Sequence, residues 1–216
     1  MRGLLKASHF GPTLIVTSIS LAFALYYWSV LPALVIALGV FLGQLIVGWS
    51  NDLHDYEDDL RHTRLHKPLI SGQISRKTLE NSLKAILPLA LLVNIFGPLG
   101  FRGGPLYLFG IGCGVAYNFY FKYSVLSPLP YALAFAALPS CIAISKDVTP
   151  PMWMWLGGAI LGVSAHFINV LKDMDQDRIS GIGGLPQRIG KKGSITIAIV
   201  LIAVGVALLS RDLFSL

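Results

Sequence analysis

The sequence predicts an all-α protein, a multi-pass transmembrane helical bundle of about seven helices forming one domain over residues 1–216. Three observations support this prediction. Hydrophobic residues make up 54% of the chain and charged residues only 13%, whereas soluble domains carry roughly 25% charge. The apolar residues gather in seven long runs. The sequence also matches itself at an offset of 118 residues, which predicts a parallel repeat of a four-helix unit whose second copy is shortened.

The seven apolar runs are each long enough, or nearly so, to supply the ~20 residues that cross a bilayer as a helix. The first run has no small-residue cleavage site, so we expect it to be retained as the first transmembrane helix. The runs fall at about residues 12–30, 31–50, 79–100, 104–121, 128–145, 151–171 and 195–210.

Two pairs of residues inside these runs predict packing rather than chemistry. Gly39 and Gly43 are four residues apart, the spacing that lets two membrane helices approach closely. Cys113 and Cys141 both lie within apolar runs, so we expect them to be inert packing residues and not a disulfide or a metal pair.

The net charge of +6 is distributed by membrane side. If the end of the second run faces inward, only three of the 17 lysines and arginines lie outside, namely Arg102, Lys146 and Arg211. This positive-inside bias predicts that the N-terminus and the acidic segment after the second run are cytoplasmic. The distribution of the basic residues is therefore explained by the lipid bilayer, which we expect as a partner. The net positive charge does not indicate nucleic-acid binding.

The acidic segment from Asn51 to Asp59 holds five carboxylates in nine residues, directly after an uncharged run. If the helix continues, Asn51, Asp55 and Asp59 recur every four residues on one face. Asp52 lies beside them. Oxygen ligands on one helix face suit Mg²⁺, which binds one or two carboxylates and fills its shell with water and phosphate. The alternative interpretation is a solvated acidic helix end.

A basic loop follows at residues 61–68 and includes Arg64 and Lys67. Carboxylates followed by bases are consistent with a bound metal diphosphate, because the carboxylates bind Mg²⁺ and Lys or Arg neutralises the remaining phosphate charge. The alternative is that the positive-inside bias alone accounts for these bases.

Aromatic residues crowd the end of the fourth run. Tyr117 and Tyr120 could belong to a π-rich wall that stabilises a carbocation, or to an ordinary aromatic belt at the membrane interface. Lys122, which follows them, is a candidate phosphate ligand.

A second acidic motif reproduces the first. It consists of Asn169, Asp173 and Asp177, which recur every four residues. At the ungapped offset of 118 residues they match Asn51, Asp55 and Asp59. The same offset pairs Pro12 with Pro130, Pro32 with Pro150, Gly39 with Gly157, Pro68 with Pro186, Gly72 with Gly190 and Thr78 with Thr196. Repeat unit one then covers about residues 8–125 and unit two about 126–216, the latter incomplete. Because a four-helix offset preserves orientation, both motifs should face the same side and form a pocket for divalent ions.

These motifs resemble those of the UbiA-type intramembrane prenyltransferases. Asn51-Asp52-x₂-Asp55-x₃-Asp59 matches that family's Asn-Asp-x₂-Asp-x₃-Asp signature, and Asp173-x₃-Asp177 corresponds to its second motif. The resemblance covers roughly residues 4–200. It implies a bundle with a central cavity open to lipid, and Mg²⁺-dependent transfer of a polyprenyl group from its diphosphate to an acceptor.

The resemblance also implies roles for individual residues. The expected metal ligands and catalytic residues are Asn51, Asp55, Asp59, Asp173 and Asp177. The expected substrate-binding residues are Asp52, Arg64, Lys67, Tyr117, Tyr120, Lys122 and Asn169.

The chain departs from the resembled family in its helix count, since those proteins generally have about nine helices. With fewer helices the cavity wall would be incomplete. We expect it to be closed by a second copy in a homo-oligomer, by a partner subunit or by lipid. Two other functions are consistent with the sequence: a transporter with a divalent-cation site, and a shortened, inactive relative that binds isoprenoids. Transporter sites usually lie near the bilayer midplane on broken helices, whereas these motifs lie at helix ends among basic residues. The acceptor and the prenyl chain length are not specified by the sequence.

Overall fold

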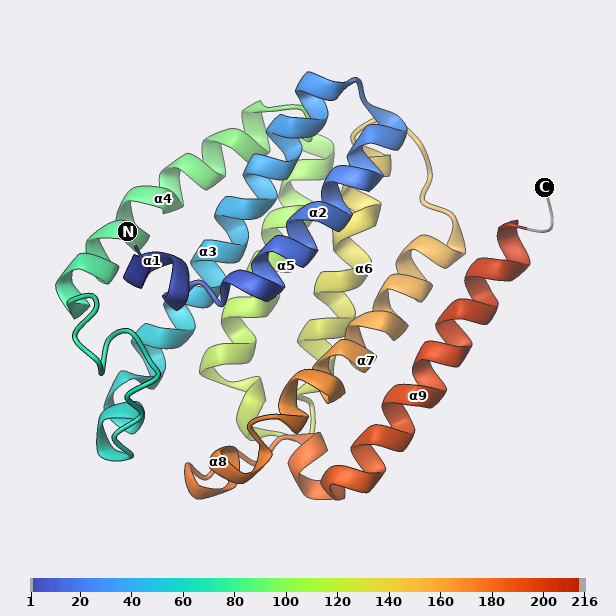
Figure 1. Cartoon of the computed structure of the whole chain (residues 1–216). Helices are drawn as coiled ribbons and strands as arrows, with labels where there is room; N and C mark the ends of the chain where they lie inside the picture. Colours follow the sequence, from blue (N-terminus) through green and yellow to red (C-terminus); the bar gives the residue numbers. More distant parts are fainter. Residues whose placement is uncertain (1, 214–216) are drawn as a thin grey trace.

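The structure is a computed structural model that describes residues 2–213, except for the side chains of Leu209, Arg211, Asp212 and Leu213. The predicted outer position of the Arg211 side chain therefore lies outside the described residues. Within the described part the chain is helical, with no strand (Figure 1). The α-helices are α1 (Arg2–Ala7), α2 (Phe10–Tyr27), α3 (Val30–Arg61), α4 (Arg76–Phe96), α5 (Gly100–Phe119), α6 (Pro128–Ile144), α7 (Gly158–Leu171), α8 (Met174–Ile179) and α9 (Leu185–Leu213). A 3₁₀ turn, η1 (Phe121–Tyr123), follows α5, and a π-helical turn, η2 (Trp153–Gly157), opens α7.

Seven long helices correspond to the seven predicted runs, which confirms the predicted fold class. Five of them are long and apolar enough to cross a membrane: α2, α3, α4, η2 with α7, and α9. The helices α5 and α6 complete the bundle. Neighbours in the chain pack on one another throughout, and α2 also contacts α6, so the bundle closes on itself.

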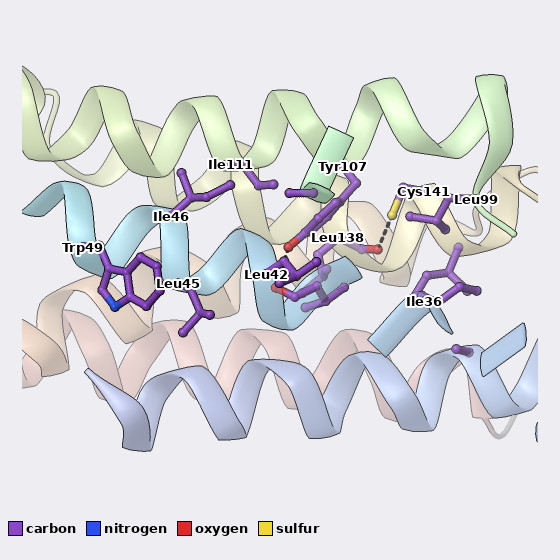
Figure 2. Close-up of a cluster of buried hydrophobic side chains, with 14 of the residues drawn as sticks. Ile36, Leu42, Leu45, Ile46, Trp49, Leu99, Tyr107, Ile111, Leu138 and Cys141 are labelled. Atoms are coloured by element: carbon purple, nitrogen blue, oxygen red, sulfur yellow. Dashed lines mark hydrogen bonds between the residues drawn. The ribbon is translucent and has the colours of Figure 1, made fainter. Parts of the chain in front are cut away.

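The core of the bundle lies around α3. Figure 2 shows Ile36 and Ile46 of this helix near side chains of α5 and α6, and Trp49 at the edge of the cluster. Both cysteines are buried and free, as predicted, and Cys141 donates its thiol hydrogen to the Leu138 carbonyl oxygen at 3.0 Å. The core therefore holds α3 rigidly along its apolar length.

Gly39 and Gly43 allow two helices to approach α3 closely, as their spacing predicts. The amide of Asn94 on α4 covers Gly39 and donates to its carbonyl oxygen at 3.3 Å. The hydroxyl of Tyr107 on α5 covers Gly43 and donates to the Val40 carbonyl oxygen at 2.9 Å. A Cβ at either glycine would overlap these side chains.

The last helix starts earlier than the sequence predicts. Residues 185–189 form a helical turn ahead of the apolar run predicted at about 195–210, and the chain then bends at Gly190, with φ 76° and ψ 174°. Glycine adopts this left-handed region without a Cβ clash, so the bend separates the turn from the long apolar part of α9.

Candidate metal and diphosphate site

The first acidic motif lies at the end of α3, which continues as one helix to Arg61 as predicted. Each of three carboxylates on this segment contacts a cation. Lys67 Nζ lies 2.8 Å from Asp52 Oδ1, and Arg64 Nη1 lies 2.6 Å from Asp59 Oδ1. The third pair joins Asp55 to Lys122, which comes from η1, 67 residues further along the chain.

These three pairs explain how charges can be buried at the edge of an apolar bundle. Asp52 is 2% exposed and Lys122 only 4%, and an unpaired buried charge would be very costly. Burial alone would lower the pKa of Lys67, but the carboxylates of Asp52, Asp59 and Asp55 outweigh it and raise that pKa. Lys67 therefore stays charged.

The second acidic motif has a different backbone. The helix α7 ends at Leu171, and Asp173, with φ −110° and ψ 2°, precedes the separate short helix α8. The four-residue spacing of Asn169, Asp173 and Asp177 therefore does not lie on one continuous helix. Aspartate is favoured at such helix starts, so the same spacing is compatible with a break.

Asp177 is the most enclosed carboxylate of the second motif. Gln187 Nε2 donates to its Oδ2 at 2.8 Å. Burial, the largest cause, and the nearby charge of Asp173 together raise the pKa of Asp177 to about 6, against the opposing effect of the Gln187 hydrogen bond. Asn169 and Asp173 are exposed.

Arg64 joins the two motifs. Its guanidinium donates both to Asp59 and to the hydroxyl of Ser180, just after α8. The charges of Lys122 and Arg64 also act on Asp177. Both motifs therefore lie at one end of the bundle, here called the motif end, as the repeat predicts.

The carboxylates are near one another but are not gathered into a preformed metal cage. Among the residues that the structure describes, no three His, Cys, Asp or Glu side chains are grouped closely enough to hold an ion. The donor set of carboxylate and amide oxygens is nevertheless the one that Mg²⁺ prefers. In this arrangement Lys67, Lys122 and Arg64 neutralise the carboxylates of the first motif.

The two predicted tyrosines lie in different surroundings. Tyr117 is within electrostatic range of Asp55, Asp173 and Asp177, and its ring stands edge-on to Tyr131 at 5.0 Å between centroids. Tyr120 is 73% exposed and follows the last residue of α5. Only Tyr117 therefore faces both motifs.

His166 is a site residue that the sequence did not single out. It is buried on α7, with its ring 5.4 Å from that of Tyr117 and 4.7 Å from that of Tyr131. Its Nε2 lies 3.0 Å from the Ser127 hydroxyl, which also accepts from the Leu185 backbone N–H. Among the described residues its Nδ1 has no hydrogen-bond partner. A lone histidine in an apolar run carries no spacing signal, although a buried polar ring in a membrane helix is usually functional.

His9 also reaches the site. It links α1 to α2 in a left-handed conformation, with φ 51° and ψ 57°. Its Nε2 lies 3.5 Å from Asp52 Oδ1, so Asp52 is held from two sides, by His9 and by Lys67.

Comparison with known proteins identifies the family. The model of the UbiA prenyltransferase family matches residues 13–215. The chain belongs to this family. No curated protein sequence matches the chain. As a UbiA member it falls among membrane-integral prenyltransferases, which confirms the resemblance drawn from its two motifs.

Solved UbiA structures share the fold. A UbiA homologue from Archaeoglobus fulgidus bound to GPP and Mg²⁺ is 19% identical with a TM-score of 0.79, covering 99% of this chain and 78% of that one. The same homologue bound to DMAPP and Mg²⁺ is 19% identical with a TM-score of 0.77, covering 96% and 76%. A structure described as digeranylgeranylglyceryl phosphate synthase in membranes is 17% identical with a TM-score of 0.69, covering 96% and 75%. At these identities the likeness establishes the fold.

Proposed function

We propose that this protein transfers a prenyl group from an allylic prenyl diphosphate to an acceptor within the membrane, with Mg²⁺ as cofactor. The observation that supports this most directly is the set of alternating charges at the motif end. Asp52, Asp55 and Asp59 are each held by a cation, and Arg64 extends this network to Ser180 beside the second motif. A metal diphosphate needs both kinds of group in one place. Family membership and the relatives that bind GPP or DMAPP with Mg²⁺ also support it.

The residues that would hold the metal are the aspartates that the two motifs share, together with the amide of Asn51. When bound, Mg²⁺ neutralises the charge that develops on the diphosphate as the C–O bond breaks. We propose that the two motifs form the two halves of one site, one in each repeat unit. The proposed ligands are Asn51, Asp55, Asp59, Asp173 and Asp177.

The basic residues would bind the phosphate oxygens of the diphosphate. Lys122 and Arg64 contact Asp55 and Asp59 directly, so their charge lies where a diphosphate bound to those carboxylates would be. Lys67 contacts Asp52, and its charge also lies close to Asp59. Asn169, exposed at the end of α7, is the amide donor from the second half.

The aromatic residues protect the allylic cation. The Tyr117 ring, packed against Tyr131 and His166, lies next to both motifs. An aromatic face attracts a nearby cation, and an apolar surrounding keeps water from capturing it. The exposed Tyr120 is a weaker candidate for this role.

We further propose that the motif end faces the cytoplasm. The strong bias of lysine and arginine towards this end supports that orientation. The prenyl tail then stays in the lipid while its diphosphate reaches the charged residues at the rim.

Purified protein in nanodiscs, incubated with Mg²⁺, a radiolabelled prenyl diphosphate and a panel of acceptors, tests the proposal. Asp55→Ala and Asp173→Ala should each abolish transfer while the protein remains inserted. Glu57→Gln is the matched control, since Glu57 lies in the same segment, is exposed and contacts Arg76 instead. Full turnover by either aspartate variant would contradict the metal-diphosphate assignment. Mg²⁺-dependent binding without product for any acceptor would point to the inactive, isoprenoid-binding alternative.

A further inference from the structure

An apolar groove lies between α4 and α5, lined by residues of these helices and of α3. It has a volume of about 570 Å³, within the ~300–1,000 Å³ that ligand pockets occupy. Ile46 of α3 contributes to its lining, Leu87 and Leu91 of α4 line one side, and Gly112 and Val115 of α5 line the other. Apart from the Tyr120 hydroxyl, the side chains that line it are apolar.

The groove arises from the way two helices diverge. Figure 1 shows α4 and α5 joined at the far end of the bundle and spreading apart toward the motif end. Small residues on facing walls, among them Ala90 and Gly112, deepen the gap. A Cβ built on Gly112 meets no atom within 4 Å. The protein itself leaves this space unfilled, and in a membrane an apolar chain is the natural occupant.

One cation marks the wall of the groove nearest the motif end. Lys84 precedes Leu87 by three residues and Leu91 by seven, so it lies on the same side of α4, one turn nearer the motif end. Lys84 is exposed, and within the described part of the chain no carboxylate pairs with it. Tyr120, whose hydroxyl can donate a hydrogen bond, closes the lining from α5.

We propose that this groove is a binding site for an anionic phospholipid, with one acyl chain against Leu87, Leu91 and Gly112 and the headgroup phosphate at Lys84. The charge at Lys84 favours an anionic headgroup over a zwitterionic one. The site is distinct from the interior aromatic cluster of the proposed prenyl site, because Tyr117 packs on Tyr131 and His166, which do not line the groove. Leu87, Leu91 and Tyr120, which do line it, are exposed. The inference depends only on membrane insertion and stands whether or not the protein transfers prenyl groups.

Photolabelling in nanodiscs tests this site. The probes are phosphatidylglycerol and phosphatidylcholine, each with a diazirine in one acyl chain, and labelled peptides are mapped by mass spectrometry. We expect phosphatidylglycerol to label the peptides around Leu87–Leu91 and residues 108–120 roughly fivefold more than phosphatidylcholine, the factor that corresponds to about 1 kcal/mol for one cation near a membrane surface. Lys84→Gln should bring this ratio to about one.

A second variant fills the groove without disturbing the fold. Gly112→Leu places a side chain in open space and should abolish labelling of the groove by either lipid. Gly11→Leu on α2 is the matched control, because a Cβ there also meets nothing within 4 Å; its groove labelling should equal that of the parent protein.

Three results would overturn the proposal. The first is equal labelling by the two lipids in the parent protein, and the second is groove labelling that persists in Gly112→Leu. The third is displacement of the label by a second occupant, seen either as a crosslinked dimer joined through the groove or as competition by excess prenyl diphosphate.

Discussion

Replacing Lys122 with methionine removes the cation from the Asp55–Lys122 pair and leaves the shape of the side chain nearly unchanged. Lys122 is almost fully buried, and Asp55 is 18% exposed. The variant therefore leaves a carboxylate with little access to water and no cation bonded to it.

The expected loss of stability follows from this burial. Removing one partner of a buried ion pair costs about 3–5 kcal/mol, and the partial exposure of Asp55 places the value near the lower limit, about 3 kcal/mol. For a chain of this size 1 kcal/mol shifts the Tm by roughly 2–4 °C, so the Tm should fall by roughly 6–12 °C. Removing both charges in Asp55→Asn/Lys122→Met should restore most of the loss, because no unpaired charge remains.

Thermal unfolding in detergent, with and without excess Mg²⁺, measures both effects. Mg²⁺ should stabilise Lys122→Met more than the parent protein, since the unpaired Asp55 is then free to bind it. Lys172→Met is the matched control: it is exposed beside the second motif, and its stability should stay within about 0.5 kcal/mol of the parent. A fully stable Lys122→Met, or a double variant as unstable as the sum of the two single changes, would refute the reasoning.

Three further predictions follow from the same contacts. Burial raises the pKa of Asp177 to about 6, so the protonated form contributes stability that is lost as the pH rises through 6. Mg²⁺ binding needs the deprotonated carboxylate, so titrations should show about tenfold weaker Mg²⁺ binding at pH 5 than at pH 7. Asp177→Asn should flatten this pH dependence. Gly43→Val should displace the Tyr107 hydroxyl from its carbonyl partner and cost about 1–3 kcal/mol in thermal unfolding, whereas Tyr107→Phe should cost about 1 kcal/mol. Arg64→Gln removes a charged hydrogen-bond donor worth about 1.5–3 kcal/mol, so the KM for prenyl diphosphate should rise at least tenfold while the KM for the acceptor does not change.

The sequence correctly predicted that the first motif continues a helix. The four-residue spacing of Asn51, Asp55 and Asp59 continues a helix that the core already fixes. The same spacing did not predict the break at Asp173, because contacts distant in the chain, such as those of Arg64 with Ser180, fix the backbone after α7.

The sequence also did not predict which charged residues form ion pairs, or which way the two tyrosines point. Nothing in the spacing of the motif indicates that Asp55 would contact Lys122, since the chain between them forms two other helices. Tyr117 and Tyr120 are three residues apart and would share a helix face, but α5 ends at Phe119 and Tyr120 leaves the helical conformation, with φ −131°. The second tyrosine therefore turns away from the site.

The length of α3 has a consequence for how the proposed Mg²⁺ would reach the carboxylates. Its 32 residues extend about 48 Å at 1.5 Å per residue, whereas the hydrocarbon core of a bilayer is about 30 Å thick. The apolar part of α3 up to Trp49 is long enough to cross the hydrocarbon core. The carboxylates that follow it therefore lie at the depth of the lipid headgroups. A leaflet rich in anionic lipid holds a surface potential of about −30 mV, which concentrates a divalent cation about tenfold at that depth. If the proposed Mg²⁺ dependence holds, the bulk Mg²⁺ concentration that supports activity should therefore depend on the charge of the surrounding bilayer.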